Sequence, residues 1–183
     1  MQARDIPNLI TVFRFLLVTP VVWAMLEGRF ALALLLFGIA GLSDAVDGYL
    51  AKRNNWSSRL GAIMDPLADK LLLVCAFVTL GWLDLIPLWL VVLIILRDII
   101  IVAGALVYHY KVQKLTMEPS LVSKLNTFAQ ILLVFAVMFS SGIQALQDTW
   151  IDALLYVVVV TTVWSGIGYI WTWGGRALGR QSS

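Results

Sequence analysis

The chain has 183 residues, of which 61% are hydrophobic and only 13% are charged, and its mean hydropathy is +0.90. Soluble domains carry charge on about a quarter of their residues, so this balance excludes a soluble globular enzyme, a disordered chain and a collagen-like chain. The net charge of +2 does not indicate a nucleic-acid partner, and the single cysteine, Cys75, excludes an internal disulfide. The length fits one integral membrane domain over residues 1–183.

Six hydrophobic segments follow one another, each long enough to cross about 30 Å of hydrocarbon. They are expected near residues 9–26, 30–51, 60–82, 86–108, 121–141 and 150–172. Their hydrophobicity is continuous and does not alternate, which predicts helices and not the strands of a barrel. The predicted fold class is therefore an all-α integral membrane protein with six transmembrane helices.

Basic residues orient the predicted bundle. Eight of them fall on one side, namely Arg4, Lys52, Arg53, Arg59, Lys111, Lys114, Arg176 and Arg180. The other side has only Arg29. Because basic residues concentrate on the cytoplasmic side of membrane proteins, both termini are expected in the cytoplasm. The first hydrophobic segment shows no signal-peptide cleavage pattern, and the eight residues before it leave too little room for a mitochondrial transit peptide. We therefore expect a bacterial protein of the cytoplasmic (inner) membrane, or an already mature form.

Nine charged residues lie within or at the ends of the hydrophobic segments. They are Arg14, Lys70, Arg97, Lys124, Asp44, Asp47, Asp65, Asp69 and Asp98. A charge at the centre of a membrane helix costs about 2.5–3.5 kcal/mol, so such residues usually face an interior cavity and have a function.

Four of these aspartates belong to two groups with helical spacing. The first group, spaced i, i+3, i+4 and i+7, is Asp44, Asp47, Gly48 and Ala51. The second, spaced i, i+4 and i+8, is Gly61, Asp65 and Asp69. Each group shares one helix face, and the short connection predicts antiparallel neighbours. The four carboxylates are therefore expected to converge near the cytoplasmic side of the membrane.

Four carboxylates at close range require cations to remain ionised. Oxygen ligands favour Mg²⁺, Mn²⁺ or Ca²⁺, and two such ions suit phosphoryl transfer. The alternatives are a polar clamp between helices, a cation transporter and a structural scaffold. Against a transporter, the acids cluster at one membrane face and have no counterpart in the second half of the chain.

The two groups together resemble the sequence motif of the CDP-alcohol phosphotransferase family, and the resemblance extends over the six-helix layout. It implies transfer of a phosphatidyl or similar group from a CDP-linked donor to an alcohol, with release of CMP, by a homodimer. It also implies that two divalent cations, Mg²⁺ or Mn²⁺, are bound by Asp44, Asp47, Asp65 and Asp69. Asp69, the last aspartate, would be the general base.

The resemblance implies a nucleotide site as well. Its residues would be Gly48, Ala51, Lys52 and Gly61. The family commonly has arginine at the position of Lys52, and lysine keeps the charge but loses the planar fork of the guanidinium group.

Within the family, the opening IPNLITVFR resembles enzymes that make acidic glycerophospholipids. The segments LDLIPLWLVVLIILRD and PSLVSKLNTFAQILLV resemble the branch that makes cardiolipin from CDP-diacylglycerol and phosphatidylglycerol. The alternative branch uses glycerol 3-phosphate and tends to carry lysine at the position of Asn126. A phosphate monoester carries nearly two charges and a diester carries one, so asparagine there favours the diester acceptor.

Arg97 and Lys124 are expected to bind the acceptor phosphate. Asp98 is expected to neutralise Arg97 or another basic neighbour, and the alternative for it is metal binding. Asn8, Thr11 and Arg14 share roughly one helix face and could form a wall of the nucleotide pocket or of the acceptor pocket. For Arg14 the alternative is a side chain that extends to the cytoplasmic interface.

Overall fold

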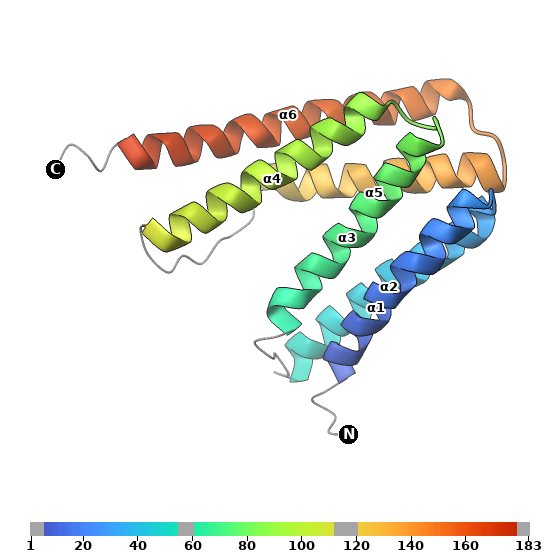
Figure 1. The fold of residues 1–183 in the computed structure, drawn as a ribbon, viewed down its shortest axis with the longest axis horizontal. Coiled ribbons are helices and arrows are strands. Elements are labelled where there is room, and N and C mark those ends of the chain that lie inside the picture. The colour runs from blue at the N-terminus through green and yellow to red at the C-terminus, as the bar shows by residue number, and fades with distance from the viewer. Residues whose placement is uncertain (1–5, 55–60, 112–120, 179–183) are drawn as a thin grey trace. The chain divides into compact units, whose positions relative to one another are not determined.

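The computed structural model describes the backbone of residues 6–54, 61–111 and 121–178, and the side chains of residues 12–43, 68, 70–103 and 121–168. Six helices and no strand are present in these residues (Figure 1). The helices are α1 (Ile6–Leu26), α2 (Phe30–Asn54), α3 (Gly61–Trp82), α4 (Leu88–Lys111), α5 (Leu121–Gly142) and α6 (Asp148–Leu178). The prediction of six helices in an all-α fold is confirmed.

The chain divides into two compact units. Unit 1 contains residues 1–86 and 134–146, and unit 2 contains residues 87–133 and 147–183. Helices α1, α2 and α3 belong to unit 1, α4 and α6 belong to unit 2, and α5 contributes its second half to unit 1 and its first half to unit 2.

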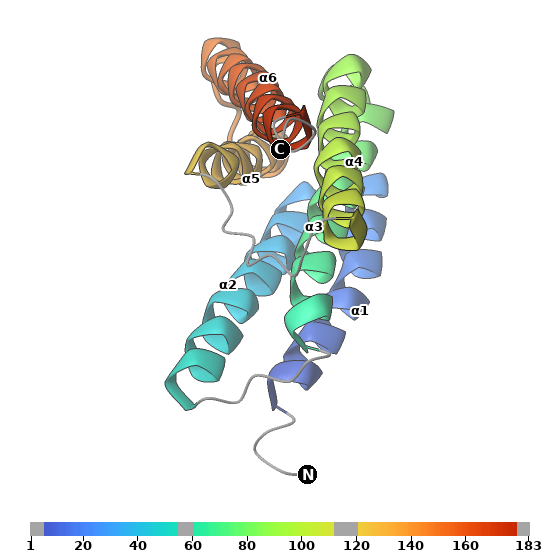
Figure 2. The same ribbon diagram turned by 90° about the vertical axis from the view of Figure 1, so that its left-hand side faces the viewer.

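In unit 1, α1 packs against both α2 and α3, and the chain reverses direction between successive helices (Figure 2). The buried core includes Val21 and Met25 of α1, Ala33 of α2, and Phe77 and Leu80 of α3. The last turn of α2 and the first turn of α3 therefore lie at the end of unit 1 where α1 begins (Figure 1).

A tight turn joins α1 to α2. Gly28 has a φ of 72°, its N–H donates to the Met25 carbonyl at 3.0 Å, and the Arg29 N–H donates to the Ala24 carbonyl at 2.8 Å. This pair of hydrogen bonds is a Schellman motif, which satisfies carbonyl groups at the helix end. The turn after α3 repeats the pattern with Asp84 at a φ of 57°.

In unit 2, α4 packs against α6. The buried apolar residues of this unit include Leu90, Val91 and Ile94 of α4 and Val158 of α6. Several polar side chains are buried with them, and these are described with the candidate site below.

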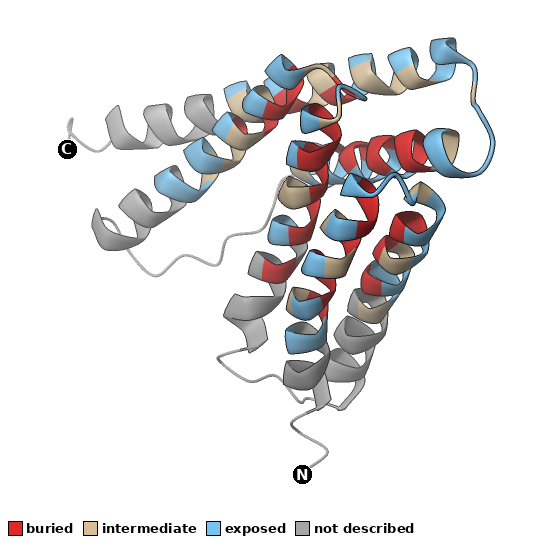
Figure 3. Ribbon diagram, turned by 45° about the vertical axis from the view of Figure 1, so that its right-hand side comes forward, coloured by how far each residue is buried: buried red, intermediate tan, exposed pale blue. Residues whose placement is uncertain are grey.

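Large apolar side chains are exposed on both units, including Leu16, Leu35, Val92, Phe128 and Trp164. Figure 3 shows exposed residues along the sides of the helices opposite the buried ones. Large exposed apolar surfaces are rare on soluble monomers and are expected where a protein faces lipid.

Two helical stretches in the described residues are long and apolar enough to cross a membrane, Leu121–Gly142 and Asp148–Gly168. Shorter apolar stretches occupy Val12–Leu26, Phe30–Ser43 and Lys70–Trp82. The six membrane crossings and the cytoplasmic position of the termini stay predictions.

Candidate functional site

The two predicted aspartate groups lie on helices that meet at one end of unit 1. Asp44 and Asp47 are in the second half of α2, and Asp65 and Asp69 are in the first half of α3. Each pair is spaced by one helical turn, so its two residues share a face of their helix. The side chains of both groups, with Gly48, Ala51, Lys52 and Gly61, lie outside the described residues. Their metal, base and nucleotide roles stay predictions.

Arg14 is buried in unit 1, with an exposed fraction of 0%. Because the turn between α1 and α2 is tight, the distances of residues from this turn along the two antiparallel helices can be compared. At about 1.5 Å per residue, Arg14 lies about 18 Å from Leu26, and Asp44 lies about 21 Å from Phe30. Arg14 is therefore at nearly the same depth as the first aspartate of the motif.

A buried guanidinium group does not fit a side chain that extends to water at the interface. The burial of Arg14 instead supports its predicted place in a pocket wall, a role that stays a prediction. The side chains of Asn8 and Thr11 lie outside the described residues, although both residues are in α1.

Arg97 joins three helices of unit 2. It is 5% exposed on α4, and its Nη2 donates to Ser123 Oγ of α5 at 2.8 Å and to Ser165 Oγ of α6 at 2.5 Å. Its Nη1 forms an ion pair with Asp98 Oδ1 at 2.6 Å. The prediction that Asp98 neutralises Arg97 is confirmed. Nε of Arg97 has no hydrogen-bond partner in the described part of the chain.

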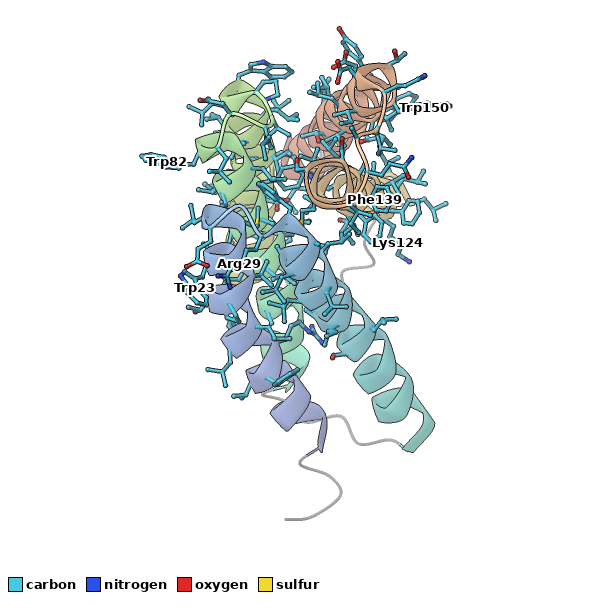
Figure 4. The ribbon with its side chains drawn as sticks, turned by 90° about the vertical axis from the view of Figure 1, so that its right-hand side faces the viewer. Trp23, Arg29, Trp82, Lys124, Phe139 and Trp150 are labelled. Atoms are coloured by element: carbon cyan, nitrogen blue, oxygen red, sulfur yellow. The ribbon has the colours of Figure 1, made fainter. Side chains whose placement is uncertain are left out.

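Lys124, the second predicted phosphate ligand, is not part of the cluster that Arg97 forms with Asp98, Ser123 and Ser165. Its side chain is exposed on α5 and points outward (Figure 4). Consecutive helical residues point about 100° apart, so Lys124 diverges from Ser123, which Arg97 contacts. The shared role of Arg97 and Lys124 toward an acceptor phosphate stays a prediction.

A second buried polar cluster lies between α5 and α6. Asn126 is 0% exposed, and its Oδ1 accepts hydrogen bonds from Thr161 Oγ1 at 2.9 Å and Thr162 Oγ1 at 2.8 Å. Gln130 follows one turn later and is 2% exposed. The Asn126 Nδ2 and Gln130 Nε2 atoms have no hydrogen-bond partner in the described residues.

The sequence reasoning identified Asn126 only by its position in the family branch, and it missed Gln130 and Ser165. An uncharged polar residue in a membrane helix indicates a function less strongly than a charged one, because its insertion costs less free energy. The i, i+4 spacing of Asn126 and Gln130 within an apolar segment is the signal that could have identified them.

No group of three or more His, Cys, Asp or Glu side chains that could hold a metal ion occurs among the described side chains. The four motif aspartates are not among those side chains. As a donor set they consist of carboxylate oxygens alone, which fits a hard divalent cation and not zinc or copper.

Comparison with known proteins gives the family. The model of the CDP-alcohol phosphatidyltransferase family matches residues 4–164, which include both aspartate groups and helices of both units. The CMP-forming cardiolipin synthases of Rattus norvegicus and Homo sapiens are each 31% identical over 182 residues, covering 90% of this chain and 60% of theirs. The chain thus spans about three fifths of the length of these two relatives.

A bacterial relative is covered more completely. The CDP-diacylglycerol–glycerol-3-phosphate 3-phosphatidyltransferase of Bacillus subtilis is 33% identical over 169 residues, which are 88% of this chain and 86% of that protein. With a family match over most of its length and this relative covered almost in full, the chain belongs to the CDP-alcohol phosphatidyltransferase family.

Proposed function

We propose that the chain transfers the phosphatidyl group of CDP-diacylglycerol to phosphatidylglycerol, giving cardiolipin and CMP. The observation that carries this proposal is the family match over residues 4–164, which includes the complete aspartate motif on α2 and α3. The similarity to the cardiolipin synthases of rat and human supports phosphatidylglycerol as the acceptor. So does Asn126, which stands where the glycerol 3-phosphate branch tends to have lysine. The compensation of Arg97 by Asp98 also favours an acceptor with one negative charge.

The second candidate is transfer to glycerol 3-phosphate. It is favoured by the Bacillus subtilis relative, of which the chain covers 86% and whose name states that acceptor. Both candidates share the donor, the leaving group and the aspartate motif, and they differ only in the alcohol that attacks.

In the proposed reaction Asp69 acts as the general base. Its carboxylate removes the proton from the acceptor hydroxyl, and that oxygen attacks the phosphorus bonded to diacylglycerol. A new phosphorus–oxygen bond forms, the bond to the CMP phosphate oxygen breaks, and CMP leaves with the electron pair. Asp69 then releases the proton to water. We propose direct attack of the acceptor oxygen, without a covalent phosphatidyl-enzyme intermediate.

The remaining motif residues bind the donor. Two divalent cations, Mg²⁺ or Mn²⁺, would be held by Asp44, Asp47, Asp65 and Asp69. When bound, these ions supply the positive charge that stabilises the pyrophosphate in the transition state. The small residues Gly48, Ala51 and Gly61 leave room for the nucleotide close to the helix backbone, and Lys52 contacts a phosphate.

The acceptor would be oriented by basic residues outside the motif. Arg97 and Lys124 bind its phosphate in this proposal, and Asn8, Thr11 and Arg14 line the pocket. The burial of Arg97 and Arg14 supports these roles, because charged residues in membrane segments usually face an interior cavity.

In the proposed setting, the chain is a homodimer in the bacterial cytoplasmic membrane. Six helices cross the bilayer, both termini are cytoplasmic, and the active site opens toward the cytoplasm. The exposed apolar side chains on both units and the predominance of basic residues on one side support this arrangement.

One competition experiment tests both candidates. The purified full-length chain is placed in vesicles containing CDP-diacylglycerol and Mg²⁺, with phosphatidylglycerol and glycerol 3-phosphate offered together. We expect CMP release and cardiolipin, identified by mass, and loss of both on chelation of divalent cations. Phosphatidylglycerophosphate as the main product would establish the second candidate. Failure to release CMP with either acceptor, or turnover that resists chelation, would overturn the proposal.

A further inference from the structure

Arg14 is the one buried charged residue in the described part of unit 1, with an exposed fraction of 0%. A guanidinium group removed from water is costly unless an anion lies beside it. The acidic side chains that the structure describes in this unit, Glu27 and Asp84, are both exposed at the turns that follow α1 and α3. Glu27 lies about 20 Å from Arg14 along α1, so other groups compensate the charge of Arg14.

The remaining acids of unit 1 are Asp5, Asp44, Asp47, Asp65 and Asp69. Asp5 precedes α1, and about two turns of that helix separate it from Arg14. Asp44, by contrast, lies at nearly the depth of Arg14 when both are counted from the turn between α1 and α2. Depth therefore favours the motif aspartates as the anions beside Arg14.

The buried face of α2 continues into the first aspartate pair. This face contains Ala33, Phe37 and Ala40, spaced by four and then three residues. Asp44 and Asp47 continue the same spacing within the helix, so they are in register with the face that is buried in unit 1. Helix α2 packs mainly against α1, the helix that carries Arg14.

The buried face of α3 contains the second aspartate pair. Ala68 and Leu72 are 0% and 6% exposed. Asp65 precedes Ala68 by three residues and Asp69 precedes Leu72 by three, so both aspartates are in register with this face. Helix α1 packs against α3 as well as against α2 (Figure 2). Both aspartate pairs thus follow helix faces that are buried in the unit where Arg14 is the buried cation.

We propose that Arg14 is the fixed counter-cation of the aspartate motif. Its guanidinium group compensates part of the carboxylate charge while divalent ions are absent, which reduces the repulsion between the acids of α2 and α3. The same positive charge repels divalent ions, so Arg14 lowers the affinity of the motif for them. This inference rests on the metal site of the proposed function. The competing explanations are that Arg14 binds a substrate phosphate or only supports packing.

The test measures Mn²⁺ binding by the purified full-length protein in detergent, without any substrate. Electron paramagnetic resonance distinguishes free from bound Mn²⁺. Arg14→Met keeps a long side chain but removes its charge, and we expect it to bind Mn²⁺ at least about tenfold more tightly than wild type, because a nearby positive charge is lost. A variant that was merely damaged would bind the ion more weakly.

Two further variants identify the charge as the cause. Arg14→Lys keeps a positive charge and is expected to bind Mn²⁺ with nearly the wild-type affinity. Arg29→Met is the matched control, because it removes the same charge from the exposed turn between α1 and α2, where Arg29 pairs with Glu27 at 3.2 Å. Its Mn²⁺ affinity should equal that of wild type, since exposed charges far from the site are screened.

A double-mutant cycle covers the case in which Arg14→Met does not fold. With divalent ions chelated, thermal unfolding is compared for wild type, Arg14→Met, Asp44→Asn and the double variant. Asp44→Asn should stabilise the protein more in the Arg14→Met background than in the wild-type background, because it removes a carboxylate that has lost its counter-cation. An equal effect in both backgrounds, or a double variant that folds no better than Arg14→Met, would overturn the inference.

The outcomes also separate this inference from the proposed function. If Arg14→Met folds and binds Mn²⁺ no more tightly than wild type, the inference is overturned and the proposed reaction stands. If wild type binds no Mn²⁺, both the inference and the proposed metal site are overturned. Tighter Mn²⁺ binding by Arg14→Met, together with a wild type that releases no CMP from CDP-diacylglycerol, would support the inference and contradict the proposed reaction.

Discussion

Asp69 is the residue whose replacement separates chemistry from folding most directly. Asp69→Asn conserves shape but removes the proposed base, so phosphatidyl transfer should fall at least about a hundredfold. The measurement is CMP release by purified protein, with helix content and elution from gel filtration checked in parallel. Asp84→Asn is the matched control, since Asp84 is exposed in a turn at a φ of 57° that asparagine also tolerates. Wild-type turnover by Asp69→Asn would exclude Asp69 as the base.

If Arg97 binds the acceptor phosphate as proposed, its ion pair with Asp98 determines how much positive charge it offers to that phosphate. Asp98→Asn leaves Arg97 uncompensated, which favours a doubly charged phosphate monoester over a diester. We expect the kcat/KM of glycerol 3-phosphate relative to phosphatidylglycerol to rise about tenfold, the effect of one strengthened charge-assisted hydrogen bond.

The ratio of the two acceptors is informative even if the variant is less stable, because both rates come from the same folded molecules. Asp152→Asn, at an exposed position of α6, serves as the control and should leave the ratio unchanged. An unchanged ratio in Asp98→Asn as well would show that the ion pair has no part in acceptor selection.

At these positions the sequence predicted the ion pair of Arg97 better than it predicted the uncharged hydrogen-bond partners of that residue. The pairing of Arg97 with Asp98 followed from two adjacent charges in an apolar segment, where isolated charges are costly. The contacts of Arg97 with Ser123 and Ser165 join residues 26 and 68 positions apart, and serine in a membrane helix has many other roles. Only the packing of the helices determines which serines it meets.

Helix positions were predictable because continuous hydrophobicity over a membrane's width has few other solutions. Helix ends were less predictable: α6 was expected over 150–172 and extends over Asp148–Leu178. Hydropathy marks the residues that are expected inside the apolar layer of the membrane. The helix itself continues beyond that layer until a cap or a turn ends it. Asp148, in the first turn of α6, is an acid favoured at that end by the helix dipole.

The turn between α1 and α2 allows a test of how the first helical hairpin is held. Gly28 has a φ of 72° and open space around it, so Gly28→Ala adds backbone strain without a clash. We expect it to destabilise the protein by about 1–2 kcal/mol, the cost of a left-handed conformation in an L-residue.

Gly38→Ala is the opposite case. Gly38 lies within α2, and beyond its chain neighbours and the adjacent backbone of its own helix no atom lies within 4 Å of an added Cβ. Alanine should therefore stabilise the helix by up to about 1 kcal/mol. Thermal unfolding of both variants in the same detergent gives the comparison. An unchanged or raised unfolding temperature in Gly28→Ala would show that the positive φ of Gly28 does not contribute to the stability of the hairpin.

For the whole molecule, the arrangement of charge predicts how the chain lies in the membrane. In the predicted six-crossing topology, which returns the chain to the side where it began, eight basic residues fall on the side of the two termini and Arg29 on the other. The loop between α5 and α6, which contains the exposed Gln147, is therefore expected outside the cytoplasm.

Single cysteines labelled with a membrane-impermeant maleimide measure this orientation. The one native cysteine is first removed by Cys75→Ala. In intact bacterial cells Gln147→Cys should be labelled at once, whereas Ser183→Cys should be labelled only after the membrane is opened. The reverse pattern would place the aspartate end of α2 and α3 on the outer face. Since CDP-diacylglycerol carries a charged nucleotide that cannot cross the bilayer unaided, that result would contradict both the orientation and the cytoplasmic release of CMP.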